Sequence, residues 1–367
     1  MMQVAGKAGA VLRIDLRAIQ DNYRLLQELL GTVQCGAAVK ADAYGLGVVP
    51  VAQALLAASC RHFFVAHLQE AIVLRSHLPK DATIYVMHGS PVGYEEEFLE
   101  NQCIPVLNSL EQIKSWQQLV AKAQRALPAI LQFDTGMARM GLSVIESEAL
   151  FATPQLLDGI NVQYMMSHLV SAEDQANPFN QKQLTTFNTL RARMPACKAS
   201  LSNSSGIFLG KDFHFDLARP GAALYGVAPV AGQANPMRAV AHLQGRIIQT
   251  REIPAGTGVG YGSTWRSSQT TRIATVGVGY ADGWMRSLSN RGIAHIAGQA
   301  VPMVGNVSMD TITLDVTGIA AKHLQPGALV ELISADNTVD QVAARANTIG
   351  YEILTSLGGR YERTYSN

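Results

Sequence analysis

The sequence contains little charge and no charged tract. Of its 367 residues, 16% are Asp, Glu, Lys or Arg, whereas about 25% is usual for soluble proteins. Lys and Arg together number 29 and Asp and Glu number 28, which gives a net charge of +1. This balance provides no positive field for nucleic acids. Because hydrophobic residues make up 48% of the chain, the sequence can bury a large core, and general disorder is excluded.

Long apolar runs and paired cysteines are also missing. No stretch approaches the roughly 18 uninterrupted apolar residues that a membrane-spanning helix needs. Lys7 and Arg13 bracket only five uncharged residues, too few for the apolar part of a secretory signal. The four cysteines are scattered and form no C-x-x-C pair. We therefore expect a reduced, cytoplasmic protein that binds neither membranes nor nucleic acids.

The first two-thirds of the chain alternate between short apolar, β-branched runs and longer segments with helical spacing. This alternation predicts parallel strands joined by helices, and eight such units predict a (β/α)8 barrel. We expect strands at residues 35–43, 62–67, 83–89, 103–108, 129–136, 162–169, 199–205 and 214–226. We expect helices at 16–30, 49–58, 70–77, 109–123 and 177–193. The barrel domain is predicted over residues 11–233.

The pattern changes from about residue 234, where short strands separated by Gly and Pro turns replace the helical spacing. The strand-rich runs lie at 241–253, 270–280, 292–305, 307–316 and 327–334. We therefore expect a mainly β C-terminal domain over residues 234–367, joined by the N-terminal residues 1–10. One late helix is predicted at 339–346.

Polar side chains follow the predicted barrel strands where a barrel enzyme has its active site, at the C-terminal strand ends. Lys40 is the most informative, because it follows three apolar residues on the first strand. Burial disfavours the charged ammonium and makes such a lysine a nucleophile for carbonyl groups. The alternative is an ordinary lysine that extends its amine to solvent. The other candidates are Asp134 at the end of strand five with Arg139 after it, His168 at the end of strand six, Asn203, Ser204 and Ser205 at the end of strand seven, and Arg219 on strand eight.

The loops after the seventh and eighth strands favour phosphate binding. LSNSSG (201–206) supplies hydroxyl groups, and RPGAA (219–223) supplies backbone amides after a Pro-Gly turn. Barrels often bind phosphate at these two loops, although ordinary turns have similar compositions. A Schiff-base lysine beside a phosphate cradle is what pyridoxal phosphate (PLP) requires. The histidines are separate and no carboxylates cluster with them, so no metal site is predicted.

These residues belong to motifs that resemble the alanine racemase family. The resemblance covers nearly the whole chain, and eight motifs in order are far more specific than any single one. They are AVKADAYGLG (38–47), FDTGMARMG (133–141), SNSS (202–205), ARPGAALYG (218–226), VGYGSTW (259–265), VGYADGW (278–284), GNVSMD (305–310) and YEILTSL (351–357). The resemblance implies a PLP-dependent racemase that interconverts L- and D-alanine and supplies D-alanine for cell-wall peptidoglycan.

The family resemblance also assigns two catalytic bases. Lys40 is expected to hold PLP and to act as the base on the D-alanine side, and Tyr261 as the base on the L-alanine side. Racemisation needs a base on each face of a planar carbanion. Because an ordinary tyrosine ionises only near pH 10, we expect His168, coupled to Arg219, to assist Tyr261. Arg219 is expected to face the pyridine nitrogen and, since arginine keeps its proton, to leave that nitrogen unprotonated.

Further roles follow from the resemblance alone. The expected PLP-binding residues are Lys40, Tyr44, Asn203, Ser204, Arg219, Gly221, Ala222 and Tyr351. The expected substrate-binding residues are Arg139, Met309, Tyr280 and Asp310. In the family, residues of the β domain reach the barrel of a neighbouring subunit, so the resemblance implies a homodimer with shared active sites.

Some positions depart from the family pattern. Gln132 occupies a position that is often a lysine, carbamylated in some members, and we do not expect that modification here. Leu46 replaces a usual histidine, and Ser308 stands where many relatives have cysteine. None of these changes removes an expected catalytic group. A broad-specificity amino-acid racemase, or another barrel-type PLP enzyme, is the alternative function.

Overall fold

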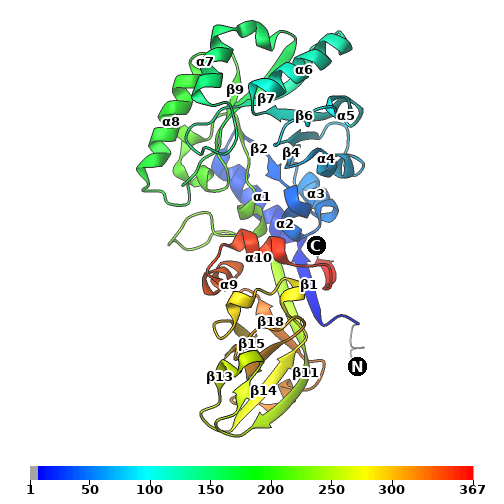
Figure 1. Cartoon of the computed structure of the whole chain (residues 1–367), viewed down its shortest axis with the longest axis vertical. Helices are drawn as coiled ribbons and strands as arrows, with labels where there is room; N and C mark the ends of the chain where they lie inside the picture. The colour runs from blue at the N-terminus through cyan, green and yellow to red at the C-terminus, as the bar shows by residue number, and fades with distance from the viewer. Residues whose placement is uncertain (1–6, 195, 367) are drawn as a thin grey trace.

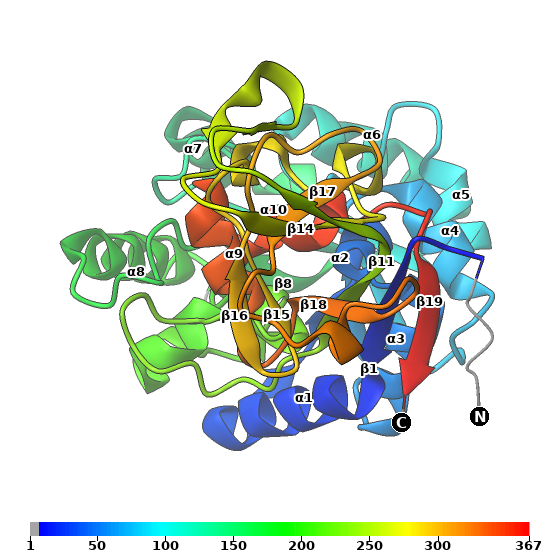
Figure 2. The same ribbon diagram turned by 90° about the horizontal axis from the view of Figure 1, so that it is seen from below.

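The computed structural model describes residues 7–194 and 196–366. It has two lobes, with the barrel at the top of Figure 1 and a mainly β lobe below it. Seen from below, the β lobe lies in front of the barrel (Figure 2). In the described part of the chain, none of the helices combines the length and the apolar character needed to cross a membrane.

Parallel strands close into the predicted (β/α)8 barrel. Seven of them pair in sequence order, as β3 (Ala37–Ala38), β4 (His62–Val65), β5 (Thr83–Val86), β6 (Cys103–Leu107), β7 (Leu127–Gln132), β8 (Ile160–Met166) and β9 (Lys198–Ser200). The eighth, β10 (Leu217–Ala218), pairs in parallel with β2 (Gln34–Cys35), which leads directly into β3. On its other side, the Arg219 amide donates to the Ser202 carbonyl at 2.9 Å. These contacts complete the ring.

Helices surround the barrel strands. They are α1 (Leu16–Leu30), α3 (Val48–Ala57), α4 (Leu68–Arg75), α5 (Glu95–Glu100), α6 (Leu110–Ala123), α7 (Val144–Ala152) and α8 (Pro178–Arg191). The short segment α2 (Lys40–Gly45) lies between β3 and α3 and has left-handed backbone angles at Ala41 to Tyr44. Local sequence explains several helix starts. Asp15 accepts a hydrogen bond from the Ala18 amide at α1, and Ser109 caps α6 through the Gln112 amide, because such side chains satisfy free amides in the first turn.

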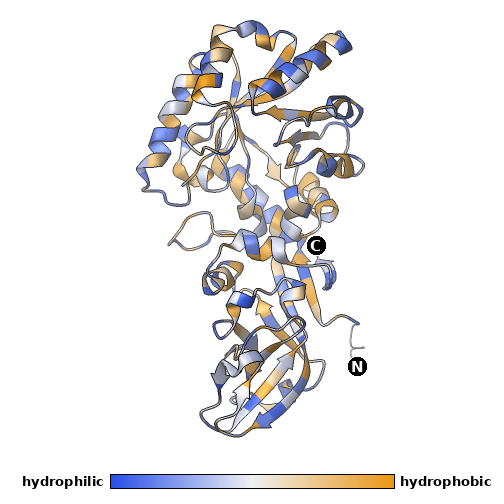
Figure 3. Ribbon diagram, viewed as in Figure 1, coloured by the Kyte–Doolittle hydropathy of each residue, from blue (hydrophilic) through white to orange (hydrophobic). Residues whose placement is uncertain are grey.

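The barrel interior is filled by side chains. Phe64, Tyr85, Val106, Ile130 and Tyr164 belong to a buried cluster that is separate from the main hydrophobic core. The main core lies between the strands and the surrounding helices and continues into the β lobe. Hydrophobic colour follows strands in both lobes (Figure 3). Because the parallel barrel strands are covered on both faces, they leave few positions for charged residues.

The β lobe is built around one long strand, β11 (Ala241–Ile253). The main sheet has the order β16-β15-β18-β11-β1-β19, and β11 also pairs with β14 (Thr271–Val276), which pairs with β17 (Ile312–Asp315). The remaining bounds are β1 (Ala10–Asp15), β15 (Ile293–Ile296), β16 (Gln299–Pro302), β18 (Leu329–Ile333) and β19 (Glu362–Ser366). The N-terminal contribution to this sheet therefore runs to Asp15, beyond the boundary expected at residue 11, and residues 1–6 of the expected 1–10 segment lie outside the described residues.

Two helices lie between the lobes, α9 (Val339–Ala346) and α10 (Gly350–Ser356). The sequence predicted α9 at these residues, and Thr338 caps it through the Gln341 amide. It did not predict α10, a helix of seven residues without a side-chain cap. Because α10 contacts α2, it brings part of the C-terminal region to the open end of the barrel.

Candidate active site

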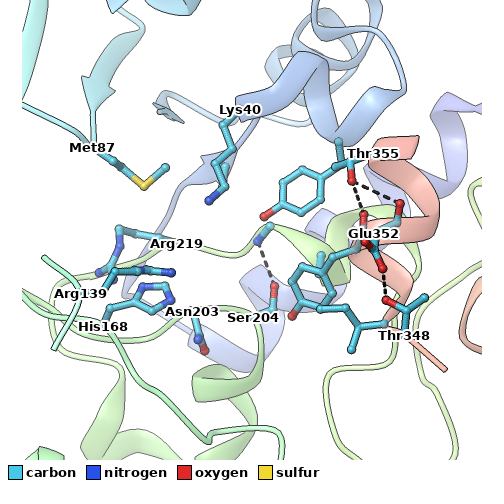
Figure 4. A pocket seen from close by; sticks show the side chains of 16 residues that line it. Lys40, Met87, Arg139, His168, Asn203, Ser204, Arg219, Thr348, Glu352 and Thr355 are labelled. Carbon is cyan, nitrogen blue, oxygen red and sulfur yellow. Dashed lines mark hydrogen bonds between the residues drawn. The ribbon is translucent and has the colours of Figure 1, made fainter. Parts of the chain in front are cut away.

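A cavity of about 580 Å³ lies at the C-terminal ends of the barrel strands. The predicted residues that line it are Lys40, Tyr44, Arg139, His168, Asn203, Ser204, Arg219, Gly221, Ala222 and Tyr351. Strand-end residues that are distant in sequence thus meet at one place, as the barrel prediction requires. Figure 4 shows the Lys40 side chain pointing into this cavity, toward Arg139, His168 and Arg219.

Lys40 stands at the start of an unusual turn. The expected strand of residues 35–43 ends at Ala38, because Ala41 to Tyr44 adopt left-handed conformations, with φ of 53° to 56° and ψ of 39° to 53°. For residues with a Cβ this conformation costs roughly 1–2 kcal/mol each. Burial lowers the pKa of Lys40, as does the positive charge of Arg139, whereas Glu70 raises it. A lowered pKa favours the neutral, nucleophilic amine.

The loops after β9 and β10 form a cradle of small polar groups. The Ser204 hydroxyl oxygen accepts a hydrogen bond from the Gly221 amide at 2.9 Å (Figure 4) and another from the Ala223 amide at 3.2 Å. The expected strand at 214–226 is limited to β10, and Ala222–Tyr225 form a 3-10 turn instead. A Cβ at Gly221 would lie 2.4 Å from the Tyr44 hydroxyl oxygen. The absence of a side chain at Gly221 therefore keeps this cradle open.

The predicted tyrosines pack beside that cradle. The ring centroid of Tyr44 lies 4.7 Å from that of Tyr225 and 6.2 Å from that of Tyr351. Burial, and after it the neighbouring Tyr351, raises the pKa of Tyr44. Burial also raises the pKa of Tyr351, with further increases from Glu173 and Asp340. Both side chains are therefore neutral hydrogen-bonding groups at neutral pH.

Arg219 is buried and held by oxygen acceptors. Its guanidinium donates to the Ser200 hydroxyl at 2.5 Å and to the carbonyls of Ser167 at 2.7 Å and Leu201 at 3.4 Å. Burial lowers its pKa to about 9, so the group stays positive at neutral pH. Burial, followed by the charges of Arg219, Arg139 and Lys40, lowers the pKa of His168 to about 3, which keeps that imidazole neutral.

Hydrogen bonds within two loops set the positions of Arg139 and Asn203. The Asp134 carboxylate accepts from the amides of Gly136, Met137 and Ala138, which shapes the turn before Arg139. Asn203 donates to the Leu169 carbonyl at 3.4 Å and accepts from the Gly206 amide at 2.9 Å. Asp134 thus shapes the loop that leads to Arg139, and Asn203 links the loops after β8 and β9.

The four predicted β-lobe residues do not line this cavity. Tyr261, Tyr280 and Met309 expose 71%, 43% and 53% of their surfaces, and Asp310 is also exposed. Their loops are nevertheless joined, because the Tyr280 amide donates to Ser308, and Asn306 donates to the Tyr261 carbonyl. These residues lie on exposed loops of the β lobe. Within a single chain they do not belong to the lining of the cavity.

Several residues that line the cavity were not predicted from the sequence. They are Ala38, Met87, Thr348, Ile349, Glu352 and Thr355. Glu352 comes four residues after Thr348, and Thr355 comes three residues after Glu352, in and just before α10. Residues three or four apart lie on the same face of a helix, so predicting a helix here would have placed these three side chains together. Met87 follows β5 at the same end of the barrel and carries no polar signal that would have distinguished it from a core residue.

Two family models together cover most of the chain. Residues 14–229 match the alanine racemase N-terminal domain, and residues 240–365 match the alanine racemase C-terminal domain. The chain belongs to the alanine racemase family. Its members include an alanine racemase of Rhodospirillum rubrum that is 48% identical over 360 residues, which are 98% of this chain and 96% of that protein.

Solved alanine racemases share the fold of the whole chain. The crystal structure of alanine racemase from Bartonella henselae with covalently bound pyridoxal phosphate matches with a TM-score of 0.94 at 44% identity, and covers 98% of this chain and 100% of that one. Alanine racemase from Streptomyces coelicolor A3(2) matches with a TM-score of 0.92 at 31% identity, covering 98% of each chain. Both lobes are therefore features of the alanine racemase fold.

Proposed function

We propose that this protein interconverts L-alanine and D-alanine with PLP bound covalently to Lys40. The observation that carries the proposal is the Lys40 amine, which enters a cavity also lined by Arg219, Ser204 and Gly221. Family membership supports the same activity. The alanine racemase of Bartonella henselae, which has covalently bound pyridoxal phosphate, supports the same cofactor.

The residues of the cavity fit PLP. Lys40 offers an amine for the aldehyde, and Arg219 offers a cation for the pyridine nitrogen. Ser204 and the amides of Gly221 and Ala222 would hold the phosphate, with Tyr44 and Tyr351 beside it and Asn203 nearby. A Cβ at Gly221 would fill the space beside the Tyr44 hydroxyl. Glycine leaves that space free, so the backbone of the cradle could approach a ligand closely.

When bound, PLP withdraws electrons from the substrate and makes its α-proton acidic. Once the substrate amine has replaced Lys40 on the cofactor, the freed neutral amine of Lys40 would take or return that proton on one face, and Tyr261 would do so on the other. The lowered pKa of Lys40 increases the fraction of neutral amine that is available to accept a proton at neutral pH. Two bases on opposite faces invert the α-carbon, whereas one base on one face would return the proton where it came from.

Arg219 would direct this chemistry toward racemisation. A positive guanidinium that keeps its proton leaves the pyridine nitrogen unprotonated, which limits electron withdrawal and suppresses transamination. The buried serine hydroxyl and backbone carbonyls around Arg219 hold it in place. His168, neutral beside Arg219 and Arg139, would then hydrogen-bond the phenol of Tyr261 and assist its proton transfer.

A second copy of the chain would complete the site. Tyr261, Tyr280 and Met309 are large and exposed on the β lobe, while the cavity of the same chain lacks them. In a homodimer the β lobe of one subunit would cover the barrel mouth of the other. Arg139 and the Met309 amide would then bind the substrate carboxylate, with Tyr280 narrowing the entrance and Asp310 near Tyr261.

We further propose a cytoplasmic enzyme that supplies D-alanine for peptidoglycan. A catabolic role is the second candidate, because the protein of Mesorhizobium japonicum named alanine racemase, catabolic, is 47% identical over 98% of this chain and 93% of its own length. Restored growth of a D-alanine auxotroph by this gene, without added D-alanine, would support the biosynthetic role.

Borohydride reduction and a substrate panel test the central proposal. Reduction of the yellow protein should fix the cofactor on the peptide that carries Lys40. Racemisation of a panel of amino acids should then be fastest for alanine, and comparable rates for larger amino acids would favour a broad-specificity racemase. Recovery of unmodified Lys40 would contradict the assignment of PLP to this residue.

A further inference from the structure

The carboxylate of Glu70 joins the ends of two neighbouring barrel strands. Its Oε1 accepts from the Ala41 amide at 2.6 Å, and its Oε2 accepts from the amides of Ala66 at 2.7 Å and His67 at 3.0 Å. Ala41 follows Lys40 after β3, whereas Ala66 and His67 lie between β4 and α4. Glu70 therefore does more than cap α4, because a capping box reaches back only to the start of its own helix.

The Ala41 amide is at the start of the left-handed turn. Such conformations are unfavourable for residues with a Cβ, so the turn persists only where its surroundings hold it. Glu70 holds the first residue of the turn, and Arg363 donates to the Gly45 carbonyl at its end at 2.6 Å. The backbone that carries Lys40 is thus fixed from the barrel at one side and from the C-terminal strand at the other.

Glu70 also contributes charge at this place. Burial and Arg139 lower the pKa of Lys40, and Glu70 raises it. The other groups facing Lys40 are His88 and His168, whose pKa values Lys40 lowers in turn, and Arg219 and Glu352, which line the same cavity. Of the two charges that act on Lys40, Arg139 is positive and Glu70 is negative.

We propose that Glu70 is a positioning residue for Lys40: through the Ala41 amide it fixes the direction from which the lysine enters the cavity, and its charge opposes that of Arg139. The inference rests on the proposed function, because it concerns the placement of the lysine that would hold PLP. It assigns a role at the site to a residue that does not line the cavity.

Two substitutions distinguish the hydrogen bond from Glu70 to the Ala41 amide from the negative charge of Glu70. Glu70→Gln keeps the length of the side chain but removes the charge, and its amide group cannot accept hydrogen bonds from amides on both sides. Glu70→Asp keeps the charge but shortens the reach. Glu146→Gln is the matched control, since Glu146 caps α7 through Ser143 and also accepts from the Leu110 amide of the neighbouring helix at 3.2 Å, yet does not act on Lys40.

The first measurement uses the full chain freed of PLP. The rate at which trinitrobenzenesulfonate modifies Lys40 is followed against pH on the Lys40 peptide. Loss of the negative charge in Glu70→Gln should move the midpoint of this profile to lower pH, because the ammonium form loses its stabilising partner. The midpoints of Glu70→Asp and Glu146→Gln should stay at the wild-type value.

The second measurement is the affinity for added PLP, read from its absorbance. Both Glu70 variants should bind PLP more weakly by about tenfold or more, because a small displacement of a reacting group has effects of this size. Glu146→Gln should bind as the wild type does. An unmoved midpoint in Glu70→Gln, unchanged affinity in Glu70→Asp, or equal weakening in Glu146→Gln would overturn the inference. If wild-type Lys40 does not bind PLP, the proposed function fails, while the midpoint comparison still reports on Glu70.

Discussion

The hydroxyl oxygen of Ser204 lies 2.9 Å from the backbone nitrogen of Gly221 and accepts its hydrogen bond. Ser204 follows β9 and Gly221 follows β10, so this contact joins the last two strand-end loops of the barrel. Neither of the two groups in this contact belongs to a charged side chain. The cradle that we propose for the phosphate is therefore made of a hydroxyl group, backbone amides and the space left by a missing side chain.

Gly221→Ala should weaken PLP binding. The added Cβ would lie 2.4 Å from the Tyr44 hydroxyl oxygen and 3.1 Å from its ring carbon, so the ring or the loop must move. We expect the affinity for PLP, measured by absorbance titration, to fall by about tenfold or more. The double variant with Tyr44→Phe should recover part of this loss.

Gly318→Ala provides the control for that substitution. A Cβ at Gly318 meets no atom within 4 Å, so PLP affinity should not change. Because Gly221 has a φ of −128°, its substitution tests space in the cradle rather than backbone strain. Undiminished PLP affinity in Gly221→Ala would argue against phosphate binding at this loop.

Mixing two inactive variants tests whether active sites are shared between subunits. Lys40→Ala and Tyr261→Phe should each have little activity as homodimers. If Tyr261 serves the partner's Lys40, a mixed dimer contains one site with both native residues. Unfolding and refolding the two variants together should restore racemisation to about a quarter of the wild-type rate by random pairing. No recovery, despite mixed dimers detected by mass, would place both bases in one chain.

Tyr261→Phe should affect the two enantiomers differently. We expect exchange of the α-proton of L-alanine in heavy water to slow by about a hundredfold or more, in the range of general-base catalysis. Exchange from D-alanine should be largely preserved, because Lys40 remains. Since Tyr261 is 71% exposed, the substitution should leave thermal stability near the wild-type value. Equal losses for both enantiomers, measured by NMR, would contradict the two-base assignment.

Arg139→Met should raise the pKa of Lys40. The positive charge of Arg139 lowers that pKa, so its removal favours the ammonium form and slows chemical modification of Lys40 at neutral pH. The midpoint of the modification profile should move to higher pH, opposite to the shift expected for Glu70→Gln. The Michaelis constant for alanine should also rise. Arg193→Met, which removes an arginine paired with Glu148 on the protein surface, should change neither quantity.

Local sequence signals predicted most of the fold. The helix at Leu16–Leu30 begins after Asp15, which caps it, and the helix at Val339–Ala346 begins after Thr338, which caps it. The start of each helix and the helical spacing of its apolar residues are therefore visible in the sequence. The turn at Ala41–Tyr44 was not, because four left-handed residues without glycine contradict local preference and depend on distant partners. The short helix α10 lacks a side-chain cap and is held by its contact with α2.

The candidate site was predictable where it depends on strand ends. Lys40, Arg139, His168 and Arg219 lie at or just after the ends of four different apolar runs, and barrel topology brings such residues together. Glu70 escaped notice because its sequence signal is that of a helix cap, and only the folded chain places Ala41 beside it. The roles of Tyr261 and Met309 come from family resemblance, since no local pattern relates an exposed loop to a cavity in another subunit.

The hydrogen bond from Arg363 to the Gly45 carbonyl spans 318 positions of sequence and bears on the order of folding during synthesis. The barrel segments leave the ribosome before Arg363 does, so one anchor of the lysine turn is made only after the barrel and most of the β lobe have been synthesised. Closing so long a loop is slow relative to local contacts. We expect nascent chains that end before Arg363 to hold a barrel whose lysine turn is not yet fixed, so that the barrel alone does not yet bind the cofactor as the longer chain does.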